Sequence, residues 1–151
     1  QARKEQQLQG KGQATEKEKM TLKGMRFLIA DDNDLNAEIL EELLKMEGAD
    51  CDRAVNGKEA VEMFARAEEG RYNIILMDIK MPVMNGYDAT KEIRRLKKKE
   101  AAKIPIFAMT ANAFAEDIRT CMEAGMDAHI AKPVDLDLLE ENIRIYMQAK
   151  A

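Results

Sequence analysis

The stretch Ile74-Ile-Leu-Met-Asp78 decides the fold class, because four consecutive apolar residues lead directly into a carboxylate. A continuous apolar run of this length is typical of a strand that helices cover on both faces. The runs Phe27–Ala30 and Ile106–Met109 have the same character and predict two more central strands. The segments Cys51–Val55 and His129–Ala131 are more mixed in polarity, which predicts the two edges of a sheet.

Segments with the 3.6-residue apolar repeat of helices separate these five runs. The first predicted helix follows Asp34, its N-cap, and ends at Gly48, and the second follows Asn56 and ends at Gly70. The third and fourth are predicted over about Tyr87–Lys99 and Ala115–Ala124, and the fifth begins at Asp135. Strands that alternate with helices through short loops predict an α/β fold. The most economical topology is a doubly wound, five-stranded parallel sheet with five helices.

The predicted helices differ in the size of their apolar face. The first helix places four apolar residues on one face, namely Ile39, Leu40, Leu43 and Leu44. The fourth helix offers only Ile118 and Met122, and we therefore predict that it is the least anchored of the five.

The chain divides into a polar segment, 1–24, and one globular domain, 25–151. The segment holds six basic, three acidic and five Gln residues, and its few apolar residues are too scattered to form a stripe, so we interpret it as a linker that is disordered or partly helical. The domain carries a net charge of -7 and no dense basic patch with interleaved aromatic residues, which argues against nucleic-acid binding. The first residue is Gln, so we expect a piece of a longer polypeptide, although trimming of a short protein would look the same.

The composition of the 151 residues, 46% hydrophobic and 34% charged, predicts a single core. No apolar run approaches the roughly 20 residues that cross a bilayer, so we expect no direct membrane insertion. The two cysteines, Cys51 and Cys121, form no metal-binding or redox pair motif and follow no signal segment. We therefore expect small core side chains in place of a disulfide, and a cytoplasmic location.

Polar side chains follow or end four of the five predicted strands: Asp31 and Asp32, Asp78, Thr110 and Lys132. The carboxyl ends of parallel strands meet at one rim, where ligands bind in such folds. Each residue alone has an ordinary structural explanation, as a helix cap, a turn hydroxyl or a solvated amine. Their recurrence at a single rim favours a functional site.

Three carboxylates in one pocket require a cation, because two of them about 4 Å apart repel by roughly 4 kcal/mol at an effective dielectric near 20. Oxygen ligands suit Mg²⁺, and the rim has no His or Cys set typical of zinc. An ammonium and a hydroxyl nearby would complete a cradle for a phosphoryl group. The sequence has no glycine-rich dinucleotide fingerprint and no P-loop, so we infer that Asp78 attacks a different phosphoryl donor and forms an aspartyl phosphate.

Four segments together resemble the receiver domain of two-component response regulators, and the similarity runs from Arg26 to about Met147. They are Leu28-Ile-Ala-Asp-Asp-Asn33, Met77-Asp-Ile-Lys-Met-Pro-Val-Met-Asn-Gly86, Ala108-Met-Thr-Ala111 and Ala131-Lys-Pro133. The resemblance implies a flavodoxin-like sheet of order 2-1-3-4-5. It also implies a phosphoryl group taken from a phosphohistidine of a histidine kinase or histidine phosphotransfer domain. Such a domain is a signalling receiver and no enzyme beyond promoting its own phosphorylation and dephosphorylation.

The resemblance assigns metal-site roles to four residues. Asp78 would be the phosphoacceptor and a metal ligand, and Asp31 and Asp32 would form the Mg²⁺ pair, with Asp32 as the direct ligand. Lys80 would add its main-chain carbonyl to the metal.

Further roles follow from the same resemblance. Thr110 would bond a phosphoryl oxygen, and Lys132 would pair with the phosphate. The peptide bond between Lys132 and Pro133 would be cis. His129 stands where the family usually has a switching Tyr or Phe, so it and Thr110 are the switch candidates. Lys80 and Asn112 flank the pocket and would tune the lifetime of the phosphate.

The segments Ala111-Asn-Ala-Phe-Ala-Glu116 and Gly125-Met-Asp127 look most like receivers of hybrid sensor kinases. This favours a C-terminal receiver of such a kinase, whose parent could be membrane-anchored, over a stand-alone regulator. Phosphorylation would then shift the face formed by the fourth helix, the fifth strand and the fifth helix.

Two other functions stay open. Asp32-Asn-Asp-Leu-Asn36 is close to the nucleophile pattern of haloacid-dehalogenase-like phosphatases, with Asp32 as nucleophile and Asn36 in place of the expected Thr or Val. The domain could also be a docking module that keeps the fold without the chemistry.

Overall fold

The computed structural model describes residues 21–111 and 118–150. The elements run β1 (Arg26–Ala30), α2 (Asp34–Met46), β2 (Asp50–Ala54), α3 (Gly57–Arg66), β3 (Ile74–Asp78), α4 (Gly86–Arg95), β4 (Ile106–Thr110), α5 (Ile118–Ala124), β5 (Ala128–Ala131) and α6 (Leu136–Lys150). All four strand pairs are parallel, in the order β2-β1-β3-β4-β5. The expected sheet and its strand order are confirmed.

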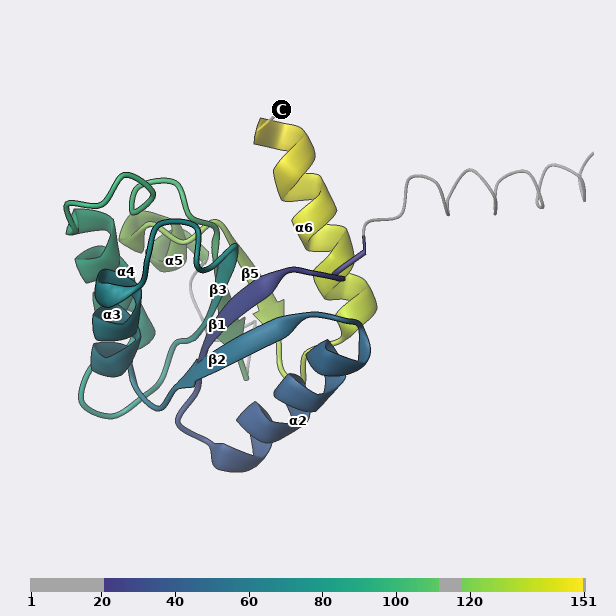
Figure 1. Ribbon diagram of the computed structural model, residues 1–151. Helices are drawn as coiled ribbons and strands as arrows, with labels where there is room; N and C mark the ends of the chain where they lie inside the picture. The colour runs from purple at the N-terminus through teal and green to yellow at the C-terminus, as the bar shows by residue number, and fades with distance from the viewer. Residues whose placement is uncertain (1–20, 112–117, 151) are drawn as a thin grey trace, which may run out of the picture.

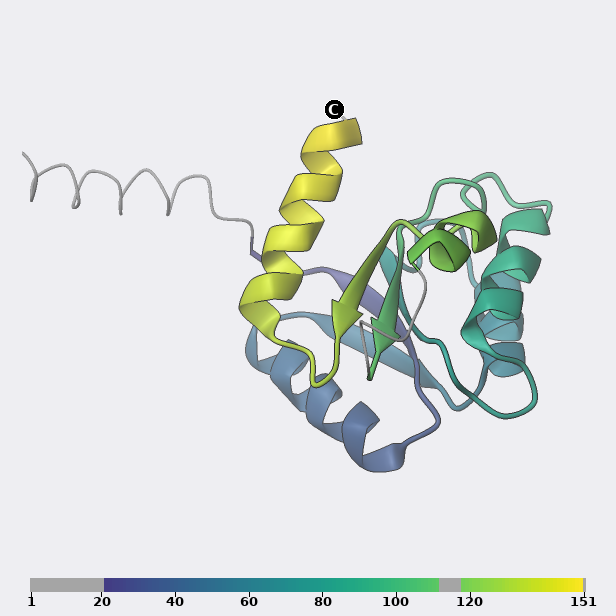
Figure 2. The ribbon, with the colours of Figure 1, turned by 180° about the vertical axis from the view of Figure 1, so that it is seen from behind.

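Helices cover both faces of the sheet (Figures 1 and 2), with α3, α4 and α5 on one face and α2 and α6 on the other. Side chains along β1 alternate between the two layers: Leu28 belongs to the core under α3 and α4, while Phe27 and Ile29 belong to the core under α2 and α6. This period of two leaves β3 and β4 buried along their whole length. Their continuous apolar runs are explained by this double burial.

Helix packing departs from the predicted faces at two places. Leu40 and Leu44 of α2 are buried, but Ile39 is 50% exposed at the edge of the layer. In α5 the predicted contacts Ile118 and Met122 are 51% and 57% exposed, and the helix instead buries Cys121 and Ala124. The predicted contacts of α5 were wrong because we chose them among the large apolar side chains at helical spacing, whereas α5 packs through small side chains.

The helix starts and the cysteines also differ in detail from the sequence interpretation. The N-cap of α2 is Asn33, whose side chain accepts the Asn36 N–H at 2.9 Å, and Asp34 is instead the first helical residue. Within the described residues, neither Cys51 nor Cys121 forms a disulfide, as predicted. Among the described helices, none has the length and apolarity needed to cross a bilayer.

The packed part of the chain begins inside the segment that we interpreted as a linker. Leu22 is fully buried in the core under α2 and α6. The Gly24 N–H donates to the Gly48 carbonyl at 2.9 Å, which attaches this segment to the end of α2. Residues 1–20 lie outside the described residues.

Gly86 is expected to be indispensable because α4 begins against the end of β3. Its N–H donates to the Ile79 carbonyl at 2.8 Å, and a Cβ at this position would overlap the Asp78 carbonyl oxygen and lie 3.0 Å from the Ile79 Cα. Backbone cannot yield as a side chain can, so we expect Gly86→Ala to lower the free energy of unfolding by about 3 kcal/mol in urea titrations. The control Gly70→Ala has φ +82° and open space around it, and should lose only about 1 kcal/mol. Equal losses in the two variants would contradict the role of close approach.

Candidate functional site

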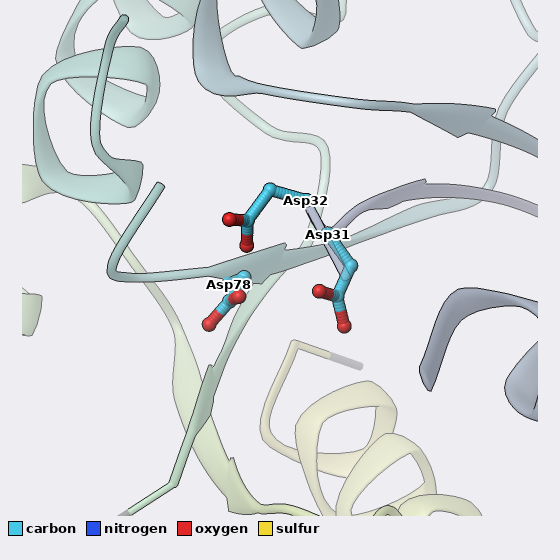
Figure 3. Close-up of side chains that lie close together, drawn as sticks. All are labelled: Asp31, Asp32 and Asp78. Carbon is cyan, nitrogen blue, oxygen red and sulfur yellow. The ribbon is translucent and has the colours of Figure 1, made fainter. Parts of the chain in front are cut away.

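Three carboxylates meet at the carboxyl end of the sheet (Figure 3). Asp31 and Asp32 directly follow β1, and Asp78 is the last residue of β3. One carboxylate oxygen from each lies within 4.8 Å of the others. Asp31 is 2% and Asp78 is 7% exposed, whereas Asp32 faces solvent. The rim predicted from the strand ends therefore gathers the three acids at one place.

Lys132 places its ammonium against two of these acids. Its Nζ lies 3.3 Å from an Oδ2 of Asp31 and 3.3 Å from an Oδ2 of Asp78. The Lys132 N–H donates to the carbonyl of Thr110, the buried last residue of β4, at 2.8 Å. The Lys132–Pro133 peptide is cis, as the resemblance implied.

An open cavity of about 350 Å³ lies above these groups. Its lining includes five of the candidate residues, namely Asp32, Asp78, Lys80, Thr110 and Lys132. His129 is a half-buried residue of β5, beside Ala108 of β4. Asn112 lies outside the described residues.

The acids are crowded enough to perturb one another. Burial, reinforced by the charges of Asp31 and Asp32, raises the pKa of Asp78 to about 6, although Lys132 acts in the opposite direction. Burial lowers the pKa of Lys132, but the charges of Asp78 and Asp31 outweigh it and the pKa is raised overall. One ammonium thus leaves negative charge unbalanced among three carboxylates. Such a set of oxygen donors fits Mg²⁺.

This crowding predicts that Asp78 destabilises the metal-free fold at neutral pH. Its pKa is about 6 in the fold and near 3.9 in an unfolded chain, so stability that is present below pH 4 is lost as the pH rises through 6. We expect the free energy of unfolding of Asp78→Asn, measured in EDTA at pH 7.5, to be about 2 kcal/mol higher than that of the wild type. The difference should vanish towards pH 4. A wild type as stable as the variant at pH 7.5 would contradict the burial of this charge.

Sequence reasoning missed one residue beside the site, Arg53 of β2. Its guanidinium donates to the main-chain carbonyl of Asp31 and forms an ion pair with Asp34. A side-chain contact to a main-chain carbonyl next to another strand produces no spacing motif in the sequence. The one sequence signal for Arg53 was a cation near the carboxyl end of a predicted edge strand.

The family model described as "Response regulator receiver domain" matches residues 27–144. The peroxide stress-activated histidine kinase mak1 of Schizosaccharomyces pombe is 36% identical over 117 residues, which are 77% of this chain and 7% of that protein. The sensor histidine kinase RcsC of Salmonella typhimurium is 35% identical over 124 residues, which are 82% of this chain and 12% of that protein. The chain therefore spans a small part of the length of these curated relatives.

Two solved structures share both fold and sequence with the chain. The receiver domain of sensor histidine kinase PA1611 from Pseudomonas aeruginosa, with a magnesium ion in its active-site cleft, is 36% identical with a TM-score of 0.69, covering 80% of this chain and 94% of that one. The receiver domain of Saccharomyces cerevisiae Ssk1, co-crystallised with the histidine phosphotransfer protein Ypd1, is 31% identical with a TM-score of 0.71, covering 82% and 89%.

These findings support the receiver interpretation and not the phosphatase alternative. The family match extends over most of the chain. The fold and strand order of the chain agree with those expected from the resemblance. The chain belongs to the response regulator receiver domain family.

Proposed function

We propose that Asp78 accepts a phosphoryl group from a phosphohistidine of a partner protein, with Mg²⁺ held by Asp31, Asp32, Asp78 and the main-chain carbonyl of Lys80. The observation that carries this proposal is the convergence of three carboxylates and the Lys132 ammonium at the end of the central strand. The magnesium ion in the PA1611 receiver supports the choice of metal.

Each residue has a chemical task in the proposed transfer. An Asp78 carboxylate oxygen attacks phosphorus, the phosphorus–nitrogen bond breaks, and the imidazole leaves as the aspartyl phosphate forms. Thr110 donates its hydroxyl to a phosphoryl oxygen, and Lys132 turns its ammonium from the acids to the transferred group. Bound Mg²⁺ supplies charge neutralisation on the phosphoryl oxygens. As an enzyme, the domain is proposed to promote nothing beyond its own phosphorylation and dephosphorylation.

The rim offers apolar surface to a partner that carries the phosphohistidine. Leu35 and Ile39 of α2 are 64% and 50% exposed. Ile39 and Val134 also line a cavity of about 100 Å³ that reaches Asp31 and Lys132. We place the docking of a histidine kinase or histidine phosphotransfer domain here, next to the acids that receive the group.

The parent protein is proposed to be a larger histidine kinase, because the curated relatives include such kinases. A cytoplasmic location is proposed for the domain, since neither cysteine forms a disulfide in the part of the chain that the structure describes.

A phosphodonor experiment tests the acceptor. The protein is incubated with Mg²⁺ and phosphoramidate, the acyl phosphate is reduced with labelled borohydride, and the labelled residue is identified by peptide mass spectrometry. Label on Asp78 supports the proposal. Label on Asp32 supports the phosphatase, and failure of any uptake supports a docking module.

Phosphorylation is proposed to act on the face formed by α5, β5 and α6, through Thr110 and His129. Within the described residues, α5 runs over Ile118–Ala124, and its buried residues there are Cys121 and Ala124. The buried hydroxyl of Thr90 in α4, whose methyl faces Gly125 after α5, has no hydrogen-bond partner within the described part of the chain. A loosely packed helix beside an unsatisfied group is easy to displace.

Amide hydrogen exchange checks this displacement. With Mg²⁺ and beryllofluoride as a phosphoryl mimic, we expect exchange in α5 to change by at least about fivefold, the lower end of usual coupling between sites. Exchange in α3, which does not belong to this face, should stay within about twofold. Unchanged exchange in α5 would rule out the switch.

A further inference from the structure

We propose that Arg53 is a positioning residue for the Mg²⁺ site, because it fixes the loop from which Asp31 and Asp32 project. The inference rests on the proposed function and deepens it, since it assigns a role to a residue of β2 that supplies no metal ligand.

The guanidinium of Arg53 uses all three of its nitrogens on this loop. Its Nε and Nη2 donate to the main-chain carbonyl oxygen of Asp31 at 3.1 and 2.8 Å. Its Nη1 lies 2.8 Å from an Oδ1 of Asp34, the first residue of α2. The Arg53 side chain is 19% exposed and that of Asp34 is 90% exposed, so the arginine is the sheltered partner. Arg53 therefore clamps both ends of the β1–α2 loop.

The clamped carbonyl belongs to the peptide that joins the two acids. The carbonyl of Asp31 and the N–H of Asp32 lie in one rigid plane with the Cα atoms of both residues, so holding the oxygen fixes the peptide from which both side chains project. The Asp31 side chain accepts the Asn33 N–H at 2.9 Å, which orders the loop locally. Arg53 adds the contact that ties this peptide to the neighbouring strand.

The sheet brings Arg53 to this point. The register places it beside Ile29 of β1, on the sheet face that α2 covers. The Asp31 N–H donates to the Ala54 carbonyl at 3.1 Å, which continues the β1–β2 ladder up to the acids. An arginine in this register can reach the start of α2, and the planar fork of its guanidinium can bind two acceptors at once.

The sign of the effect separates positioning from simple electrostatics. A positive charge close to a divalent site repels the metal ion, so loss of the charge alone would tighten Mg²⁺ binding. Loss of an anchor for the ligand loop would instead weaken binding, because the acids must then be ordered when the ion binds. Weaker binding after removal of a nearby cation is thus the diagnostic result.

Isothermal titration of the full chain with MgCl₂ alone tests the inference on the wild type, Arg53→Met, Arg53→Lys and the control Arg71→Met. Arg71 also lies 2.8 Å from an aspartate, Asp52, but its ion pair does not involve the acid loop. We expect Arg53→Met to raise the Kd for Mg²⁺ about tenfold, the lower end for outer partners of metal ligands. Arg53→Lys keeps the charge but loses the fork, so it should also raise the Kd severalfold, while Arg71→Met stays within about twofold.

Circular dichroism at the titration temperature checks that each variant is folded. If Arg53→Met does not fold, Arg53→Lys replaces it as the test variant. An unchanged or lower Kd in the folded Arg53 variants would overturn the positioning role. A Kd for Arg53→Lys equal to that of the wild type would also overturn it, because the planar fork that holds both ends of the loop would then be unnecessary. A wild type that binds no Mg²⁺ would contradict the proposed function itself, which keeps the two failures distinct.

Discussion

Asp78→Asn is expected to take up no phosphoryl group from phosphoramidate and Mg²⁺ under conditions in which the wild type is fully labelled. Asn has nearly the same shape as Asp, so the cavity and its neighbours stay in place. The neutral amide, however, lacks the carboxylate oxygen that attacks phosphorus. Intact-protein mass spectrometry reads the result directly, as the presence or absence of one added phosphoryl group.

The neighbouring variant Asp32→Asn provides the matched comparison. If Asp78 is the acceptor, Asp32→Asn weakens metal binding but is still labelled on Asp78 when Mg²⁺ is raised. If Asp32 were the nucleophile, the two variants would exchange roles, with label on Asp32 in the Asp78→Asn protein. Because Asp78→Asn is predicted to be more stable than the wild type without metal, loss of labelling cannot be ascribed to unfolding.

The sequence allowed the sheet and its rim to be predicted because both depend on local patterns. The apolar runs of β3 and β4 end in Asp78 and Thr110, and parallel pairing then brings their carboxyl ends together. No long-range knowledge was needed for this step. The same logic explains why Lys132 also lies at the site, because it directly follows β5, whose last residue, Ala131, pairs with Thr110.

The long side chains that tie distant segments together could not be predicted, because they act on backbone atoms far along the chain. Arg53 contacts the carbonyl of Asp31 across a strand pair, and Arg94 contacts carbonyls that precede β4 and β5. A pattern of residue types carries no record of such contacts. Two cations at the end of the helix predicted over about Tyr87–Lys99, namely Arg94 and Lys98, are largely buried.

Arg94 connects three segments through one guanidinium. It donates to the carbonyls of Ala101 and Ile104 at 2.9 and 2.8 Å and to that of Gly125 at 3.1 and 2.8 Å. It also donates to an Oδ2 of Asp127 at 2.9 Å, and the same oxygen accepts the N–H of Ile106 at the start of β4. The residue therefore joins α4 to the entrances of both β4 and β5.

Arg94→Ala is accordingly expected to lower the free energy of unfolding by about 3 to 5 kcal/mol in urea titrations, because it leaves three carbonyls and a partly buried carboxylate without their donor. The adjacent Arg95 is the matched control: its side chain is 74% exposed and lies 3.9 Å from Glu92. Arg95→Ala should change the free energy of unfolding by no more than about 0.5 kcal/mol. Losses of similar size in the two variants would mean that helix propensity or net charge, and not the buried network, determines the contribution of this segment to stability.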